Sequence, residues 1–238
     1  MDRFEQLRRL ARLVPGGMAA GRAARRWLDP DLREIIRLKR EESAALLQPF
    51  PDTFEDRYPA LFDALALRLA DHPAPRILSF GCSSGAEIRA LRRRLPNARF
   101  TGIDPNRRAL ARARAADPHG DYRAGTAPAE GDSFDAILAM AVLRHGALEA
   151  ERPDRCDAVL PFERVAETVA GLERSLAPGG WLAVGNAHFR VSDCPAAAAL
   201  WPDPQDFGQL SRPSLLYGAD GRRIESPAPV PVLFHKPD

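Results

Sequence analysis

Residues 76–87 read Arg-Ile-Leu-Ser-Phe-Gly-Cys-Ser-Ser-Gly-Ala-Glu. The apolar residues among the first five favour β-structure, so residues 76–80 are predicted to form a short buried strand. The residues from Gly81 to Gly85 are all small and predict a turn. Ala86 to Leu95 then carry apolar side chains every three or four positions among arginines, which predicts a helix with one apolar face. Such a strand, loop and helix lets a ligand approach the backbone closely, because glycine has no Cβ and the first helical turn has free N–H groups.

A second strand is predicted at Phe100 to Ile103, and it ends at Asp104 and Pro105. An acidic residue at the tip of the second strand, about 20 residues past the glycine loop, can accept both hydroxyls of a ribose. The loop has the spacing Gly81-x-x-x-Gly85 and not the Gly-x-Gly-x-x-Gly of a pyrophosphate reader. The two features together favour a nucleoside-containing cofactor and disfavour NAD.

The remaining chain continues to alternate predicted helices and strands, which is typical of an α/β protein. Helices are predicted at residues 2–14, 31–47, 61–70, 107–116 and 162–176, and strands at 121–124, 134–140, 181–184, 215–224 and 230–235. Asp29 or Asp31 is expected to cap the second helix beside Pro30. Phe50, Phe54 and Tyr58 precede the first strand, and they either line a cleft or fill the seam between an N-terminal arm and the core.

Four motifs in this order resemble those of class I S-adenosylmethionine-dependent methyltransferases: residues 77–87, Asp104, residues 133–138 and residues 176–182. The resemblance implies a Rossmann-like, doubly wound α/β fold with a mostly parallel seven-stranded sheet and an antiparallel last strand. It also implies an N-terminal helical arm or cap over residues 1–58 and a methyltransferase domain over residues 59–238. The glycine loop is similar to that of chemotaxis-receptor methyltransferases as well, although the residues after the fourth strand depart from that group.

The resemblance further implies that the cofactor is S-adenosyl-L-methionine. The cofactor-binding residues expected from it are Phe80, Gly81, Cys82, Ser83, Gly85, Asp104, Pro105, Thr126, Ala127, Met140 and Ala141. The family usually has an acidic residue where Ser79 stands and glycine where Ser83 stands, and it often has an acidic residue near Thr126. These departures predict weaker cofactor binding with an unchanged fold.

Three residues are candidates for a role in catalysis because they follow the predicted fourth and fifth strands. His145 has an ordinary pKa suited to a general base, or it only begins a helix. His188 and Arg190 end the fifth strand, where they can meet a substrate. Arg190 either clamps a carboxylate or phosphate or forms an ion pair with a neighbouring aspartate. Cys82 is expected to be a small packing residue.

Composition narrows the class of protein. The 238 residues carry a net charge of +2, so no strong field points to nucleic acid as an obligatory partner. Three scattered cysteines indicate neither a disulfide framework nor a metal site. The N-terminal residues lack the apolar core of a signal peptide, and no run approaches the length of a membrane span. A cytoplasmic protein is expected, whose oligomeric state the sequence leaves open.

The function expected from the sequence is methyl transfer from S-adenosylmethionine to an unidentified small-molecule or protein acceptor. One alternative is a binding or scaffold protein of the same fold that has lost catalysis, motivated by the departures at Ser79, Ser83 and Thr126. Another alternative is a nucleotide-sugar or NAD enzyme, which the loop spacing disfavours. Because the sulfonium of such a cofactor is already activated, no catalytic triad or metal is required.

Overall fold

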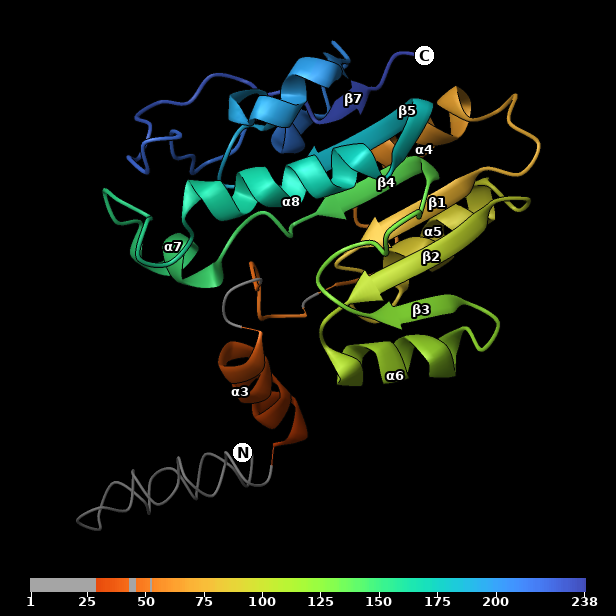
Figure 1. The fold of residues 1–238 in the computed structure, drawn as a ribbon, viewed down its shortest axis with the longest axis horizontal. Coiled ribbons are helices and arrows are strands. Elements are labelled where there is room, and N and C mark those ends of the chain that lie inside the picture. The colour runs from red at the N-terminus through yellow and green to blue at the C-terminus, as the bar shows by residue number, and fades with distance from the viewer. Residues whose placement is uncertain (1–28, 43–45, 52) are drawn as a thin grey trace, which may run out of the picture. The chain divides into compact units, whose positions relative to one another are not determined.

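The computed structural model describes residues 29–42, 46–51 and 53–238 (Figure 1). The chain divides into two compact units, residues 1–43 and 44–238. In the first unit, helix α3 (Pro30–Glu41) begins after Asp29, whose Oδ1 accepts the N–H groups of Asp31 and Leu32 at 3.0 and 3.1 Å. The predicted cap at Asp29 is therefore confirmed. The helix ends at Glu41 and does not reach Leu47 as predicted.

The helix predicted at residues 2–14 lies outside the described residues. The division into an arm of residues 1–58 and a domain of residues 59–238 stays a prediction. In the structure, residues 46–58 belong to the unit that carries the sheet, with residue 52 outside the description. Within the described ranges, no helix is long and apolar enough to cross a membrane.

The second unit is built on a seven-stranded sheet with the order β3-β2-β1-β4-β5-β7-β6. The strands are β1 (Arg76–Phe80), β2 (Arg99–Asp104), β3 (Asp121–Ala124), β4 (Phe134–Met140), β5 (Leu176–Gly185), β6 (Trp201–Pro202) and β7 (Leu233–His235). Strands β1 to β5 run parallel to one another. Strand β7 runs antiparallel to both β5 and β6. This topology confirms the predicted Rossmann-like fold. Its strand order reverses between β1 and β4, where ligands bind in such sheets.

Helices cover both faces of the sheet, so its central strands are apolar on both sides. The helices of this unit are α4 (Pro59–Arg68), α5 (Ala86–Arg94), α6 (Arg107–Ala116), α7 (Gly146–Glu151) and α8 (Phe162–Arg174), with short 3₁₀ turns at Val191–Asp193, Pro195–Ala199 and Gly208–Leu210. Neighbouring residues of β1 separate into two cores. Leu78 packs in the cluster that includes Val169 of α8, and Ile77 packs in the cluster that includes Leu65 of α4 and Leu91 of α5.

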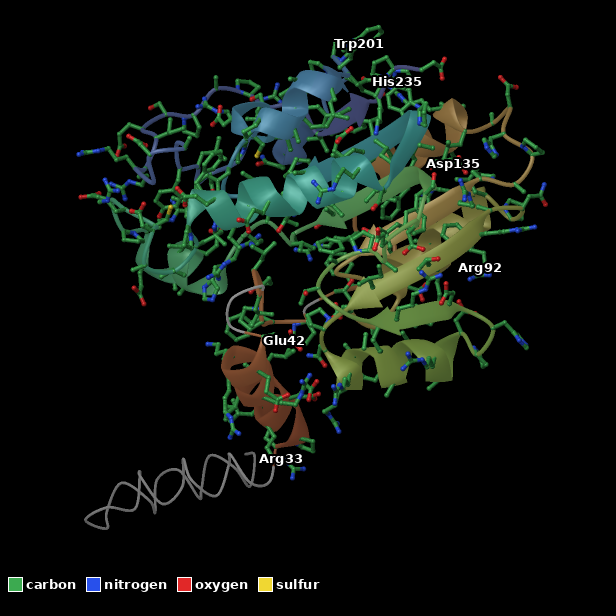
Figure 2. All side chains as sticks on the ribbon, viewed as in Figure 1. Arg33, Glu42, Arg92, Asp135, Trp201 and His235 are labelled. Carbon is green, nitrogen blue, oxygen red and sulfur yellow. The ribbon has the colours of Figure 1, made fainter. Side chains whose placement is uncertain are left out.

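Two strand predictions near the C-terminus need correction. Strand β5 begins at Leu176, which pairs with Phe134, and the next paired residue is Trp181. Residues 177–180 therefore form a bulge inside the strand, with Gly179 at φ +70°, and not a turn before it. The strand predicted at residues 215–224 is also wrong, because this segment does not join the sheet. The N–H of Tyr217 donates instead to the carbonyl of His188, in the loop after β5. That segment forms two isolated bridges, Tyr217 with Arg223 and Arg222 with Arg155, and β6 lies beside β7 instead, where Trp201 pairs with His235 (Figure 2).

Candidate functional site

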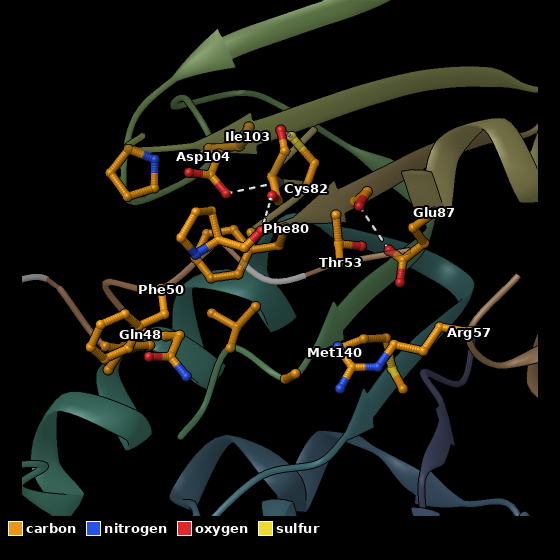
Figure 3. A pocket seen from close by; sticks show the side chains of 18 of the residues that line it. Gln48, Phe50, Thr53, Arg57, Phe80, Cys82, Glu87, Ile103, Asp104 and Met140 are labelled. Atoms are coloured by element: carbon orange, nitrogen blue, oxygen red, sulfur yellow. Dashed lines mark hydrogen bonds between the residues drawn. The ribbon is translucent and has the colours of Figure 1, made fainter. Parts of the chain in front are cut away.

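An open pocket lies at the carboxyl ends of β1, β2 and β4 (Figure 3). One wall comes from the segment that precedes β1, and the other comes from the loops that follow these strands. The lining residues are Leu46, Leu47, Gln48, Phe50, Pro51, Thr53, Phe54, Arg57, Tyr58, Phe62, Ser79, Phe80, Gly81, Cys82, Ser83, Glu87, Ile103, Asp104, Pro105, Gly125, Thr126, Met140, Ala141 and Val142. All of them belong to the second unit.

The loop after β1 requires glycine at both ends. Gly81 has φ +74°, and a Cβ on it would lie 2.4 Å from Cγ2 of Val142. The N–H groups of Gly81 and Cys82 both donate to the carbonyl of Ile103, at 2.8 and 3.1 Å. Gly85 also has φ +74°, and a Cβ there would lie 2.6 Å from the hydroxyl oxygen of Tyr122. The positive φ favours glycine at both positions, and a Cβ at either one would collide with its neighbour.

Three residues other than glycine adopt positive φ just after the central strands: Ser83 at 50°, Ala141 at 59° and Asn186 at 51°. They follow β1, β4 and β5, so these three positions lie at the carboxyl ends of the central strands. Left-handed conformations disfavour side chains with a Cβ and cluster at functional sites. The hydroxyl of Ser83 donates to the carbonyl of Pro51 at 2.7 Å, which ties the loop to the segment in front of it.

Asp104 ends β2 and is buried at the pocket wall. Its Oδ2 accepts the N–H of Ser83 at 2.8 Å, and its Oδ1 accepts the N–H of Asn106 at 2.7 Å. Two backbone donors thus fix the carboxylate beside the loop of Ser83, at a place where a carboxylate can accept the hydroxyls of a ligand.

A second carboxylate lies in the same pocket. Glu87, in the first turn of α5, accepts a 2.7 Å hydrogen bond from the hydroxyl of Ser79 at its Oε1. Burial raises the pKa of Glu87 to about 7, against the hydrogen bond from Ser79 and the charge of Arg57, which both lower it. The carboxylate therefore changes its charge near neutral pH.

Arg57 is the cation of the pocket lining. Its guanidinium carbon lies 5.4 Å from the ring centroids of both Phe54 and Tyr58, within the range of cation–π attraction. The hydroxyl of Tyr58 accepts a hydrogen bond from Nδ2 of Asn186 at 2.8 Å, which joins this wall to the end of β5. In Figure 3, Arg57 and Glu87 lie toward one end of the pocket and Asp104 lies toward the other.

Nine of the eleven residues predicted to bind a cofactor line this pocket, and Gly85 and Ala127 do not. Gly85 packs against Tyr122 and begins α5. Thr126 is at the pocket, but it carries no carboxylate. Burial, with the nearby charges of Asp104 and Glu87, raises the pKa of the Cys82 thiol far above its ordinary value, so the interpretation of Cys82 as a packing residue fits its surroundings. Contact of these residues with a cofactor stays a prediction.

None of the three predicted catalytic residues is among those that line the pocket. His145 begins α7, where its Nδ1 accepts the N–H of Ala147 at 3.1 Å. His188 is buried, and its Nε2 lies 3.1 Å from Oε1 of Glu149. Burial lowers the pKa of His188, against the opposing effect of that carboxylate.

Arg190, the third of these residues, forms an ion pair with Asp193 at 3.0 Å. This is the structural alternative that the sequence left open for it. A role of any of the three in catalysis stays a prediction.

The structure adds Glu87, Arg57 and Gln48 to the pocket. The sequence carries a signal only for Glu87, because it lies in the first turn of the helix that follows the glycine loop. Arg57 and Gln48 precede β1 by many residues in a proline-interrupted segment, so their place depends on how that segment folds back over the sheet. Neither periodicity nor spacing predicts that path.

The fold and the site together define a Rossmann-like α/β protein with a ligand pocket at the switch point of its sheet. Residues 78–182 match the model of a family described as a methyltransferase domain. This match, together with the strand order of the sheet, agrees with the resemblance of the chain to class I S-adenosylmethionine-dependent methyltransferases. A comparison with curated protein sequences finds no match.

Similar solved structures include two proteins described as methyltransferases and a third, DesVI. SAM-bound CalS10, an amino pentose methyltransferase from Micromonospora echinaspora, is 23% identical over 56% of this chain and 51% of its own, with a TM-score of 0.44. DesVI of Streptomyces venezuelae is 17% identical over 68% of this chain and 58% of its own, with a TM-score of 0.42. The plantazolicin methyltransferase BpumL with SAH is 18% identical over 68% of this chain and 55% of its own, also with a TM-score of 0.42. The chain spans about half to three-fifths of the length of these proteins.

Proposed function

We propose that this protein transfers a methyl group from S-adenosyl-L-methionine to a small-molecule or protein side-chain acceptor. The observation that carries the proposal is the distribution of charge in one pocket. A fixed carboxylate, Asp104, lies toward one end, and an oppositely charged pair, Glu87 and Arg57, lies toward the other (Figure 3). This pattern matches a ligand whose ribose hydroxyls lie at some distance from an amino-acid zwitterion.

Glu87 and Arg57 suit the methionine part of the cofactor. An ionised Glu87 attracts an ammonium group, and the Arg57 guanidinium can donate a pair of hydrogen bonds to a carboxylate. The residue at position 79, where the family usually has an acid, is a serine that donates to Glu87. The carboxylate that the strand lacks is thus supplied from the first turn of α5.

Asp104 and the glycine loop suit the ribose. The Asp104 carboxylate, held in place by the N–H groups of Ser83 and Asn106, is the acceptor for the two ribose hydroxyls. The absence of a side chain at Gly81 keeps the floor of the pocket open, since a Cβ there would collide with Val142. Phe80, Met140 and the neighbouring apolar groups exclude water from the space between the two charged ends.

The cofactor supplies an activated methyl group on a sulfonium, so the protein has to hold an acceptor in line and keep water out. The described residues that line the pocket include no histidine. Among them, Glu87 is the carboxyl whose pKa lies near 7. The main contribution of the chain to such a reaction is the orientation of both partners. A cytoplasmic location and the choice of acceptor remain part of the proposal.

Calorimetry with S-adenosylmethionine and S-adenosylhomocysteine tests the cofactor, and the absence of binding at millimolar ligand would overturn the proposal. Transfer of a labelled methyl group to fractions of a cell extract tests the activity. Binding without transfer to any fraction would favour the alternative of a catalytically inactive binding or scaffold protein. An acceptor labelled in the extract then identifies the substrate by mass spectrometry.

A further inference from the structure

Gln48 lies in the pocket wall with an unused hydrogen-bond acceptor. Its Oε1 is buried and has no hydrogen-bond partner among the described residues. Leaving a buried polar atom without a partner costs about 1–3 kcal/mol, so such atoms in a pocket point to a ligand. We propose that the Gln48 amide binds the adenine edge of the cofactor and makes the site specific for an adenine base, an inference that rests on the proposed function.

The position of Gln48 agrees with the order of groups in the cofactor. The amino-acid end and the adenine lie on opposite sides of the ribose. In Figure 3, Glu87 and Arg57 occupy one end of the pocket, whereas Gln48 and Phe50 lie toward the same end as Asp104. With the ribose at Asp104 and the zwitterion at Glu87, the adenine extends toward the end where Gln48 lies.

The chemistry of the amide fits this edge. A glutamine side chain offers one acceptor oxygen and an NH₂ donor, and adenine offers its 6-amino donor beside a ring-nitrogen acceptor. The two groups can form a pair of hydrogen bonds, as glutamine does with adenine in nucleic acids. On the edge that carries the 6-position and N7, a base with a 6-oxo group in place of the amine offers two acceptors and no donor, so the Gln48 oxygen has no partner there.

The surroundings of Gln48 hold it in place for such a contact. Leu47 on one side is buried in the core cluster that contains Leu143 and Val165. On the other side, the Phe50 ring packs close to Gly146, where a Cβ would lie 3.2 Å from it. The carbonyl of Pro51 accepts the hydroxyl of Ser83 at 2.7 Å. Anchors on both sides therefore fix this part of the pocket wall before a ligand arrives.

Thr126 does not offer the same recognition, although it follows β3 and lines the pocket. Its hydroxyl is a single group, whereas the amide of Gln48 presents an acceptor and a donor together. The two carboxylates of the pocket already accept hydrogen bonds from the chain itself: Asp104 accepts from Ser83, and Glu87 accepts from Ser79. Gln48 is thus the side chain best suited to read the base.

The test compares two ligands that differ only at the base, S-adenosylhomocysteine and its 6-oxo analogue S-inosylhomocysteine. Calorimetry measures both dissociation constants for the wild type, Gln48→Leu and Gln205→Leu. Gln205 is the matched control, because it is exposed and its Oε1 accepts a bond from Arg68 at 3.0 Å outside the pocket. The wild type and the control are expected to prefer the adenine ligand by about tenfold or more.

In Gln48→Leu, we expect the affinity for S-adenosylhomocysteine to fall by about tenfold and the preference for adenine to disappear. An unchanged preference in Gln48→Leu, or none in the wild type, would overturn the role of Gln48 while the cofactor proposal stands. Failure of the wild type to bind either ligand would instead overturn the proposed function. Thermal unfolding of the ligand-free variants shows whether a loss of affinity comes from a folding defect. The loss of an unpaired buried acceptor should not lower the unfolding temperature of Gln48→Leu.

Discussion

The hydroxyl of Ser79 donates a 2.7 Å hydrogen bond to Glu87. This contact joins the end of strand β1 to the first turn of helix α5 inside the pocket. The class I family usually has an acidic residue at the position of Ser79. Here the carboxylate comes instead from Glu87, eight residues further along the chain. The pocket thus has a carboxylate near the end of β1 that comes from helix α5 and not from the strand itself.

The charge of Glu87 should make ligand binding depend on pH. Its pKa of about 7 in the folded protein means that it is largely neutral at pH 6 and largely ionised at pH 8. Only the ionised form attracts the ammonium group of S-adenosylhomocysteine. We expect the affinity to rise severalfold from pH 6 to pH 8 in the wild type and to stay nearly constant in Glu87→Gln, as measured by calorimetry. Equal pH slopes in the two proteins would contradict this role.

Stability provides the control for this titration. The folded pKa of Glu87 is raised from an ordinary value of 4.5 to about 7, so the native state binds more protons than the unfolded state between those values. The free energy of unfolding should therefore decrease as pH rises through this window, by about 1–3 kcal/mol. Urea unfolding at pH 5 and pH 8 should show this decrease in the wild type and not in Glu87→Gln.

Asp104 should contribute to both folding and binding. Asp104→Ala removes the acceptor of two backbone N–H groups, those of Ser83 and Asn106, and leaves them without this partner. We expect a loss of at least tenfold in affinity for S-adenosylhomocysteine and a loss of about 1–3 kcal/mol in unfolding free energy. Asp104→Asn keeps one acceptor oxygen and should lose less stability. Undiminished affinity in both variants, measured by calorimetry, would exclude Asp104 from the ribose site.

A methyl group at Gly81 should collide with Val142. The positive φ of Gly81 disfavours alanine by about 1–2 kcal/mol, and the overlap with Cγ2 of Val142 adds to this. Gly81→Ala should therefore lower the unfolding free energy by about 2–4 kcal/mol. Val142→Ala removes the atom that collides, so the double variant should recover about 1 kcal/mol of this loss. Strictly additive effects in urea unfolding would show that the contact is not the cause.

Two substitutions at Ser83 should separate backbone strain from the contact with Pro51. Ser83→Ala loses the hydrogen bond to the Pro51 carbonyl and retains the left-handed backbone, so it should destabilise the fold by about 1 kcal/mol. Ser83→Gly loses the same bond but relieves the strain, so it should be more stable than Ser83→Ala by about 1 kcal/mol. Urea unfolding measures both values. The reverse order would refute the strain inferred at this loop.

His188 and Arg190 should differ in their effect on stability. His188 is 1% exposed and bonded to Glu149, so His188→Ala should cost about 2–4 kcal/mol of unfolding free energy. Arg190 forms a partly exposed ion pair with Asp193, and Arg190→Ala should cost less than about 1 kcal/mol. Neither residue lines the pocket, so the affinity for S-adenosylhomocysteine should stay within twofold in folded protein. A large loss of affinity in Arg190→Ala would instead place it near the ligand.

The central fold could be predicted from local patterns because each of its units is short and regular. The predicted strands at residues 76–80, 121–124 and 134–140 have the observed bounds, as does the helix at residues 107–116. Gly81 and Asp104 could also be predicted to share one edge of the sheet, since parallel strands bring their carboxyl ends together. The predicted closing strand at residues 230–235 is present as the shorter β7, whereas the two-residue β6 was not predicted because it carries almost no period of its own.

Local patterns in the sequence specify the central strands and helices, the glycine loop and the acidic residue beside it, because hydrophobic period and backbone freedom act over a few residues. Tertiary packing, by contrast, brings Gln48 and Arg57 to the pocket and leaves His188 and Arg190 outside its lining. Those outcomes depend on how a proline-interrupted segment and the loop after β5 pack against the sheet. Such packing is settled by contacts between residues far apart in the chain, which no local pattern records.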